Sequence, residues 1–190
     1  DDQARYNRRL RAAYSVSWVK VTAEPTPRLI ITKEIKVDSR FGARYIGPFT
    51  SRGAANSVID VINGTIALRT CTSKIAAQPR TNIPGRVRAE LGKCASPCTR
   101  EHDLELYLQV VNHAGGSMSG STSAVVAHIT KLMETLAAAE RFEEAAMWRE
   151  ALGNYVNAVF RTERLRWIAT TSELVAAQNT IDGGWEIHVI

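Results

Sequence analysis

The sequence predicts an α+β protein: a small antiparallel strand region with a helix and a cysteine loop, followed by an αα-hairpin and a C-terminal strand pair. Apolar and polar residues alternate in the first third of the chain, which is typical of half-buried strands. Two later segments place apolar residues three and four positions apart, which is typical of amphipathic helices. The 190 residues are 45% hydrophobic, enough for one sizeable core or two small ones.

The N-terminal strands are predicted from alternation and from turn residues. Residues 15–21 (SVSWVKV) alternate, and residues 28–37 (RLIITKEIKV) are β-branched with the same period. A third, short strand is expected through residues 45–46. It is expected to end at Gly47 and Pro48, because both residue types interrupt strands. Together these segments predict a small antiparallel meander.

Two helices and a linker are expected next. Ser51 is a plausible N-cap for a helix whose apolar residues recur at helical spacing over residues 54–62, and Gly64 stands where that helix should stop. Residues 103–111 (DLELYLQVV) predict a short helix. The Gly/Ser-rich stretch 113–122 (HAGGSMSGST) predicts a flexible linker and therefore a boundary between two modules.

The strongest periodic signal lies in the last third of the chain. One apolar stripe covers residues 125–136 and a second covers residues 142–159, with a short turn between them. Two such stripes predict an antiparallel αα-hairpin. Residues 174–178 and 185–190 then predict two strands that meet at an Asp-Gly-Gly turn.

Charge divides the chain into two parts. Residues 1–100 carry 18 Lys and Arg against 7 Asp and Glu, whereas residues 101–190 carry 6 against 12. Clustered positive charge raises the affinity for phosphates, so the first part is expected to meet a polyanion and the second part something else. The alternative is that these charges are ordinary solvated surface.

The composition also excludes several classes of protein. No apolar run approaches the roughly 20 residues that a membrane-spanning helix needs, and no signal peptide is recognisable, so no membrane partner is expected. Three cysteines, an odd number, offer no disulfide framework. A reducing, cytoplasmic location is therefore expected.

The cysteines themselves suggest a metal site. Cys94 and Cys98 form a C-x3-C pair, and Cys71 precedes them in a segment with little core of its own. Grouped thiolates bind zinc or an iron–sulfur cluster, although three unrelated small hydrophobic residues are the alternative. His102 continues the four-residue spacing and is a candidate substitute ligand, but a surface histidine is the simpler interpretation.

Four segments, in this order and spacing, resemble the bacterial UvrC family, the excinuclease subunit that incises damaged DNA. They are Tyr45-Ile-Gly-Pro-Phe-Thr-Ser51, Leu68-Arg-Thr-Cys71, Leu91-Gly-Lys-Cys-Ala-Ser-Pro-Cys98 and Ala139-Glu-Arg-Phe-Glu-Glu-Ala-Ala146. The tail, at residues 173–178 and 184–190, is most similar to actinobacterial proteins in which a DnaQ-type exonuclease precedes a UvrC-like GIY-YIG nuclease.

The resemblance implies a division of the chain and a catalytic residue. The parts are the end of a GIY-YIG nuclease domain (1–20), a basic strand, helix and cysteine-loop region (21–112), the linker (113–122), a UVR-type hairpin (123–170) and the start of a C-terminal strand region (171–190). Asn7 matches a late active-site asparagine of the nuclease, with a turn residue as the alternative. The other catalytic groups would lie upstream, so this chain is expected to be inactive alone.

The resemblance also implies a 4Fe-4S cluster held by four cysteines. Three positions match at Cys71, Cys94 and Cys98, but the expected fourth position holds Arg86. A weakened cluster, a zinc ion with a substitute ligand and no metal at all are the alternatives.

Basic residues near the nuclease end and the cysteine loop are expected to contact DNA phosphates without reading sequence. They are Arg5, Arg8, Arg9, Arg11, Arg69, Lys74, Arg80, Arg86, Arg88 and Lys93. Trp18, Tyr45 and Phe49 could stack on exposed bases, although aromatic residues in strands more often belong to the core.

The hairpin resembles the UVR motif, through which UvrC-type proteins pair with a matching hairpin of UvrB. Phe142 is the expected anchor, with Glu143, Ala146 and Arg149 around it. The alternative is that the hairpin packs on the strands of its own chain. The predicted function is a fragment of a DNA repair endonuclease that binds DNA and UvrB, with a zinc-binding nucleic-acid module or a helical adaptor as alternatives.

Overall fold

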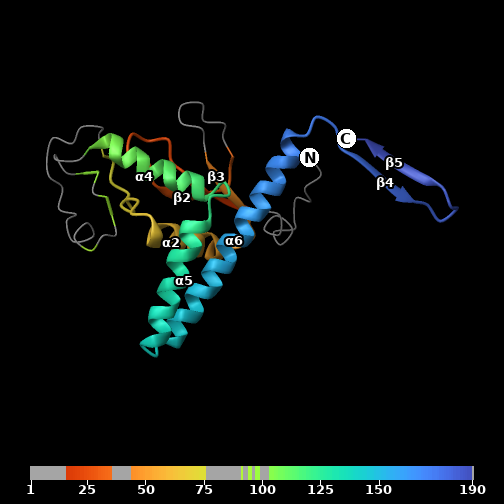
Figure 1. Cartoon of the computed structure of the whole chain (residues 1–190). Coiled ribbons are helices and arrows are strands. Elements are labelled where there is room, and N and C mark those ends of the chain that lie inside the picture. The colour runs from red at the N-terminus through yellow and green to blue at the C-terminus, as the bar shows by residue number, and fades with distance from the viewer. Residues whose placement is uncertain are drawn as a thin grey trace, which may run out of the picture.

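The computed structural model describes residues 16–35, 44–75, 91, 94–95, 97–98 and 103–189 (Figure 1). The α+β class predicted from the sequence is confirmed. The elements in chain order are β1 (Ser17–Val21), β2 (Leu29–Thr32), β3 (Tyr45–Phe49), α2 (Arg52–Thr65), α4 (Leu104–Ser117), α5 (Ser123–Ala138), α6 (Phe142–Thr170), β4 (Val175–Asn179) and β5 (Trp185–Val189).

The first three strands form one antiparallel sheet in the order β2-β1-β3. In β1, Val19 lies opposite Ile31 of β2 and Ile46 of β3, and its side chain is fully buried. Because β1 is the central strand, it cannot be separated from β2 and β3. The boundary expected at residue 20 therefore falls inside this sheet.

The predicted end of the third strand at Gly47 and Pro48 is wrong, because β3 continues to Phe49. Gly47 has φ +145°, a conformation that glycine adopts freely, and a Cβ there would lie 3.0 Å from the Trp18 side chain. Pro48 lacks an N–H group, but β3 is an edge strand, where proline is tolerated.

Helix α2 begins where the sequence predicts and ends later. The Ala54 N–H donates to the Ser51 hydroxyl at 3.1 Å, so Ser51 is the N-cap. The helix passes Gly64 and ends at Thr65. A Cβ on Gly64 would lie 3.2 Å from the Trp148 ring of α6, so this glycine allows two helices to approach closely.

The flexible linker predicted at residues 113–122 is also wrong. Helix α4 continues to Ser117, and Met118, in the turn that follows, is fully buried. Gly115 is buried against Arg44, because a Cβ at this position would lie only 1.9 Å from an Arg44 nitrogen. The Tyr155 hydroxyl donates to the Ser117 carbonyl at 2.7 Å. The small residues here allow close packing.

The predicted helical hairpin is confirmed as α5 and α6, which run side by side (Figure 1). Their turn includes Glu140 at φ +58°. Helix α6 has 29 residues against 16 in α5. Its middle packs on α2 and β3, where the Gly47 N–H donates to the Thr162 hydroxyl at 2.9 Å.

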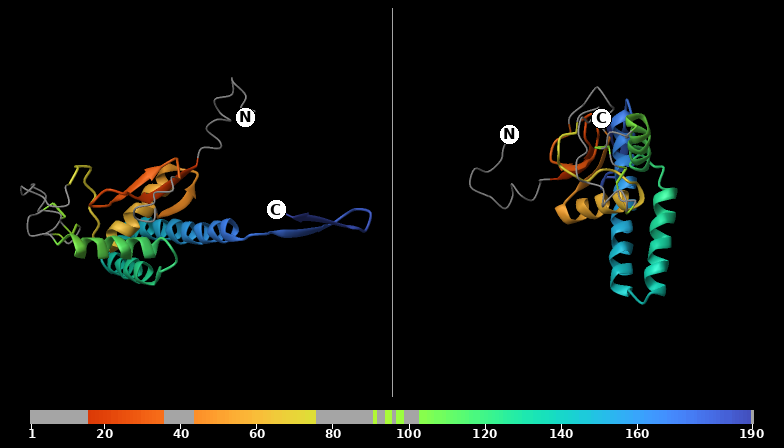
Figure 2. Two further views of the ribbon diagram at one scale, coloured as in Figure 1. Left: turned by 90° about the horizontal axis from the view of Figure 1, so that it is seen from above. Right: turned by 90° about the vertical axis from the view of Figure 1, so that its left-hand side faces the viewer.

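The C-terminal strands β4 and β5 pair as predicted, from Val175 opposite Val189 to Asn179 opposite Trp185. They extend beyond the end of α6, and every residue of both strands is exposed (Figure 2). Among the described residues, no helix is long and apolar enough to cross a membrane.

Candidate functional site

Two of the ten basic residues predicted to contact DNA lie in the described part of the chain, Arg69 and Lys74. Lys74 is exposed. The other eight lie outside the described residues, as do the catalytic candidate Asn7 and the substitute ligand His102. They are Arg5, Arg8, Arg9, Arg11, Arg80, Arg86, Arg88 and Lys93. Their predicted roles stay predictions.

Arg69 does not face solvent, so its predicted contact with DNA phosphate is wrong. Only 1% of the residue is exposed. The guanidinium donates from Nε to the Thr26 carbonyl at 2.6 Å, and from one terminal nitrogen to the carbonyls of Cys71 at 3.0 Å and Ser73 at 2.9 Å. The other terminal nitrogen lies 2.6 Å from a carboxylate oxygen of Glu24. Arg69 therefore joins the segment around Cys71 to the loop between β1 and β2.

Tyr107 of α4 completes this buried polar cluster. Its hydroxyl donates to the Pro27 carbonyl at 2.6 Å and accepts from the Arg69 N–H at 3.2 Å. Burial of the phenol raises the pKa of Tyr107 to about 12, since the anionic form would lose its hydration. The phenol is therefore a neutral structural group that holds residues 69–73 against α4.

The cysteines lie around this cluster. Cys71 is exposed, Cys94 and Cys98 are half-buried, and the Arg69 guanidinium lies 3.5 Å from the Cys71 sulfur. The Ala95 N–H donates to the Ala67 carbonyl at 2.8 Å, which ties the Cys94 segment to the same region. Across the described residues, no three potential ligands come together as a metal site. The predicted cofactor stays a prediction.

Most other cations in the described part of the first 100 residues have partners. Arg28 lies 3.2 Å from Glu24, and the Arg44 guanidinium donates to the carbonyl and side-chain oxygens of Asn112. Lys20 lies 5.9 Å from the centre of the Tyr45 ring. These contacts leave fewer cations for a polyanion than the sequence count suggests.

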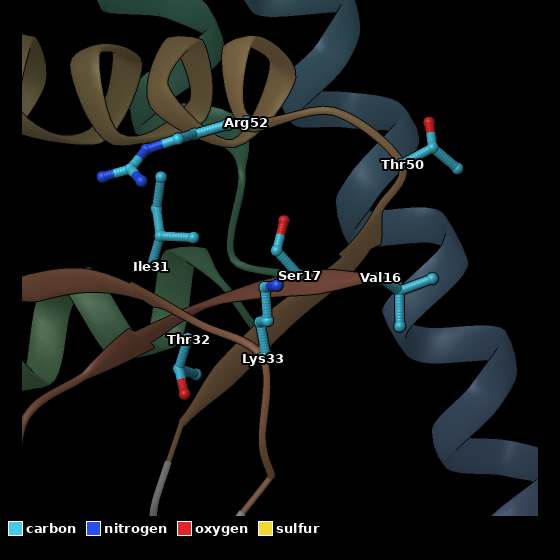
Figure 3. A pocket seen from close by; sticks show the side chains of 7 residues that line it. All are labelled: Val16, Ser17, Ile31, Thr32, Lys33, Thr50 and Arg52. Atoms are coloured by element: carbon cyan, nitrogen blue, oxygen red, sulfur yellow. The ribbon is translucent and has the colours of Figure 1, made fainter. Parts of the chain in front are cut away.

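Two cations that the sequence analysis missed line one pocket of about 320 Å³ (Figure 3). They are Lys33, just after β2, and Arg52, the first residue of α2. Arg52 directly follows the predicted cap Ser51, but Lys33 lies inside the strand predicted over residues 28–37, so the sequence offered little sign that the two come together. The pocket also contains the hydroxyls of Ser17, Thr32 and Thr50.

The three aromatic residues considered for base stacking lie mainly in the interior. Phe49 is buried, with 3% of its surface exposed. Trp18 and Tyr45 are half-buried, and Trp18 lies against Gly47. For Phe49 the core interpretation is therefore confirmed.

The hairpin tip presents an exposed apolar residue with charged neighbours. Phe142 is 64% exposed and Met147 is 63% exposed, and Glu143, Ala146 and Arg149 are exposed around them. Arg141 pairs with Glu144 at 2.6 Å on the same turn. The predicted partner-binding residues are thus on one end of the hairpin.

The base of the hairpin, in contrast, packs on its own chain. Trp148 lies against Gly64, and the Asn154 side chain donates to the Ser57 hydroxyl at 3.2 Å. Thr162 of the same helix bonds to Gly47 in β3. The alternative that the hairpin packs on its own chain is therefore confirmed for α6 between Trp148 and Thr162, whereas pairing with UvrB stays a prediction.

The sequence of this chain is similar to those of several known proteins. The sequence model of the family "UvrC/Cho excinuclease, middle domain" matches residues 16–117. A Mycobacterium tuberculosis protein named as a bifunctional exonuclease/endonuclease is 32% identical over 97% of this chain and 28% of its own length. The UvrABC system protein C of Moorella thermoacetica is 34% identical over 78% of this chain and 23% of its own.

A further UvrABC system protein C, from Alkaliphilus oremlandii, is 27% identical over the whole chain and 30% of its own length. The chain thus spans between about a quarter and a third of these relatives. No solved structure matches.

Proposed function

The chain belongs to the UvrC/Cho excinuclease family, and on that premise we propose that it holds DNA by its phosphates and pairs with UvrB through the tip of its hairpin. The observation that carries the proposal is that the basic and the acidic residues lie in different parts of the chain. Residues 16–117, which the family match covers, carry 14 Lys and Arg against 8 Asp and Glu and make a basic body. The hairpin carries an acidic tip with an exposed aromatic residue.

The DNA-binding half of the proposal depends on charge. The net charge of +11 over residues 1–100 favours a polyanion, and cations that contact only phosphates bind every sequence equally. An excinuclease must act wherever damage lies, so binding without sequence preference suits it. Two labelled duplexes of equal length and unrelated sequence should bind with the same affinity, and a tenfold preference for one of them would contradict the proposal.

The nuclease chemistry of this family is not proposed for this chain alone. Asn7 is the single catalytic position carried over from the resemblance, and a phosphodiester cleavage site needs a metal-binding carboxylate and a base as well. Cys71, Cys94 and Cys98 would hold a metal if one binds. We expect no full cluster because Arg86 replaces a ligand, and four irons per chain after anaerobic preparation would contradict this.

The partner-binding half depends on Phe142. An apolar anchor surrounded by charged residues is the usual anatomy of a small protein interface, and here Phe142 has Glu143 and Arg149 beside it. A second hairpin docked on this tip would bury the ring, which two exposed helix ends cannot do by themselves. The base of the hairpin is fixed by Tyr155 and Thr162, so the tip is presented rigidly.

Calorimetry with a UvrB C-terminal hairpin tests this half directly. Phe142→Ala should weaken pairing about 30-fold or more, because truncation of a buried aromatic anchor typically costs about 2 kcal/mol or more. Phe160→Ala is the matched control, since Phe160 lies on the same helix and is 67% exposed. Pairing weakened equally by both substitutions, or by neither, would contradict docking at the tip.

A further inference from the structure

The pocket between β1, β2 and the start of α2 has the chemistry of a phosphate site. Its lining contains two cations, Lys33 and Arg52, and no carboxylate. In the described part of the chain, neither cation has an ion-pair partner, whereas Arg28, Arg69, Arg141 and Arg166 each have one. Two unpaired like charges at one pocket repel each other, and an anion between them relieves that repulsion.

The hydroxyl groups add donors to the same pocket. Ser17 is half-buried, and its hydroxyl lies 3.5 Å from the Phe49 carbonyl, a contact too long to hold it firmly. Thr50 is exposed at the rim. Thr32, by contrast, already bonds to the backbone of Glu34. Ser17 and Thr50 can therefore turn toward a bound oxyanion.

The pocket also has an apolar part, which a free anion does not need. In Figure 3, Arg52 extends from the start of α2 over Ile31, and Lys33 lies beside Ser17. Ile31 and Val16 supply apolar surface next to these polar groups. A phosphate joined to a sugar matches this combination, because the sugar can lie on the apolar part. A volume of about 320 Å³ is at the lower end of the range for small-ligand pockets.

We propose that this pocket binds one phosphodiester of a nucleic-acid strand, with Lys33 and Arg52 on the phosphate oxygens and Ile31 beneath the sugar. The proposal rests on the proposed DNA binding and names a contact for it. Phosphate contacts of this kind carry no sequence information. The pocket therefore affects only where the strand lies on the protein and how tightly it binds.

The test uses the whole 190-residue chain and the salt dependence of its affinity for a labelled DNA duplex. The double variant Lys33→Gln, Arg52→Gln should reduce the slope of log K against log salt by about 1 to 2, since each lost phosphate contact removes about one unit. Both residues are exposed, so the melting temperature should not change. The control Lys131→Gln, Arg166→Gln removes the same charge from the helical hairpin and should leave the slope unchanged.

The possible outcomes distinguish phosphate binding by this pocket from DNA binding by the chain as a whole. If the wild type binds and the double variant matches it, the pocket is not the phosphate site, although DNA binding stands. If the wild type does not bind, DNA binding is wrong and this inference is wrong with it. In an NMR titration, a short oligonucleotide should shift the amides of Ser17, Ile31 and Thr50. Shifts caused by inorganic phosphate but not by the oligonucleotide would overturn the proposal in favour of a small-anion pocket.

Discussion

Replacing Arg69 tests whether this arginine is structural. In Arg69→Met the side chain keeps most of its apolar stem but loses the guanidinium, which donates to the Thr26, Cys71 and Ser73 carbonyls. The substitution also leaves the Glu24 carboxylate without its closest cation, at 2.6 Å. The expected result is a large loss of stability with no direct effect on DNA binding.

The size of that loss follows from the burial of the two partners. Removing one partner of a buried ion pair costs about 3–5 kcal/mol. The Arg69 side chain is fully buried, but the Glu24 side chain is 29% exposed, so water can still hydrate the carboxylate that remains. We therefore expect about 3 kcal/mol, the lower end of that range. This is a substantial part of the 5–15 kcal/mol by which a domain is typically stable.

Urea unfolding followed by circular dichroism measures the change. Lys74→Met is the matched control, because Lys74 loses the same charge from an exposed position nearby and should change stability by less than about 0.5 kcal/mol. DNA affinity, measured where both variants are folded, should be unchanged in Arg69→Met. A structural role for Arg69 would be contradicted if Arg69→Met is as stable as the wild type and binds DNA more weakly than Lys74→Met does.

Two further substitutions test the packing around the site. The pKa of Tyr107 rises from 10.0 to about 12 in the fold because its phenol is buried. The contribution of this buried phenol to the free energy of unfolding is therefore complete below pH 10 and is lost as the pH rises from 10 to about 12. Unfolding at several pH values should show the wild type losing its advantage over Tyr107→Phe across that window, and a constant difference would contradict the burial argument. Thr162→Val keeps the side-chain shape but removes the acceptor of the buried Gly47 N–H, which should cost about 1–3 kcal/mol in urea unfolding. The exposed Thr170→Val is the control, and equal losses in the two variants would count against this bond.

The sequence predicted the features that depend on neighbouring residues. The Ser51 cap bonds to a backbone N–H three residues away, and the paired strands of residues 175–179 and 185–189 follow from alternation around a tight turn. The exposed position of Phe142 at the hairpin tip also follows from the local pattern of the turn. Such features need no knowledge of the rest of the fold.

The errors have a common physical cause, which is contact between residues far apart in the chain. Gly115 suggested a linker, but it is small because Arg44 lies against it. Arg69 looked like one more surface cation, but it is buried and bound to Thr26 and Glu24 in the loop after β1. Lys33 and Arg52 come together only because β2 and α2 meet at one end of the sheet. None of these contacts leaves a periodic trace in the sequence.

The salt dependence of DNA binding by the whole chain is the most direct measurement of the proposed function. If the basic body contacts three to five phosphates, the slope of log K against log salt on a duplex should be about −3 to −5. The positive charge of residues 1–100 then acts as a phosphate-binding surface. An affinity that does not change between low and moderate salt would contradict this, and would leave the hairpin tip as the one binding surface proposed for this chain.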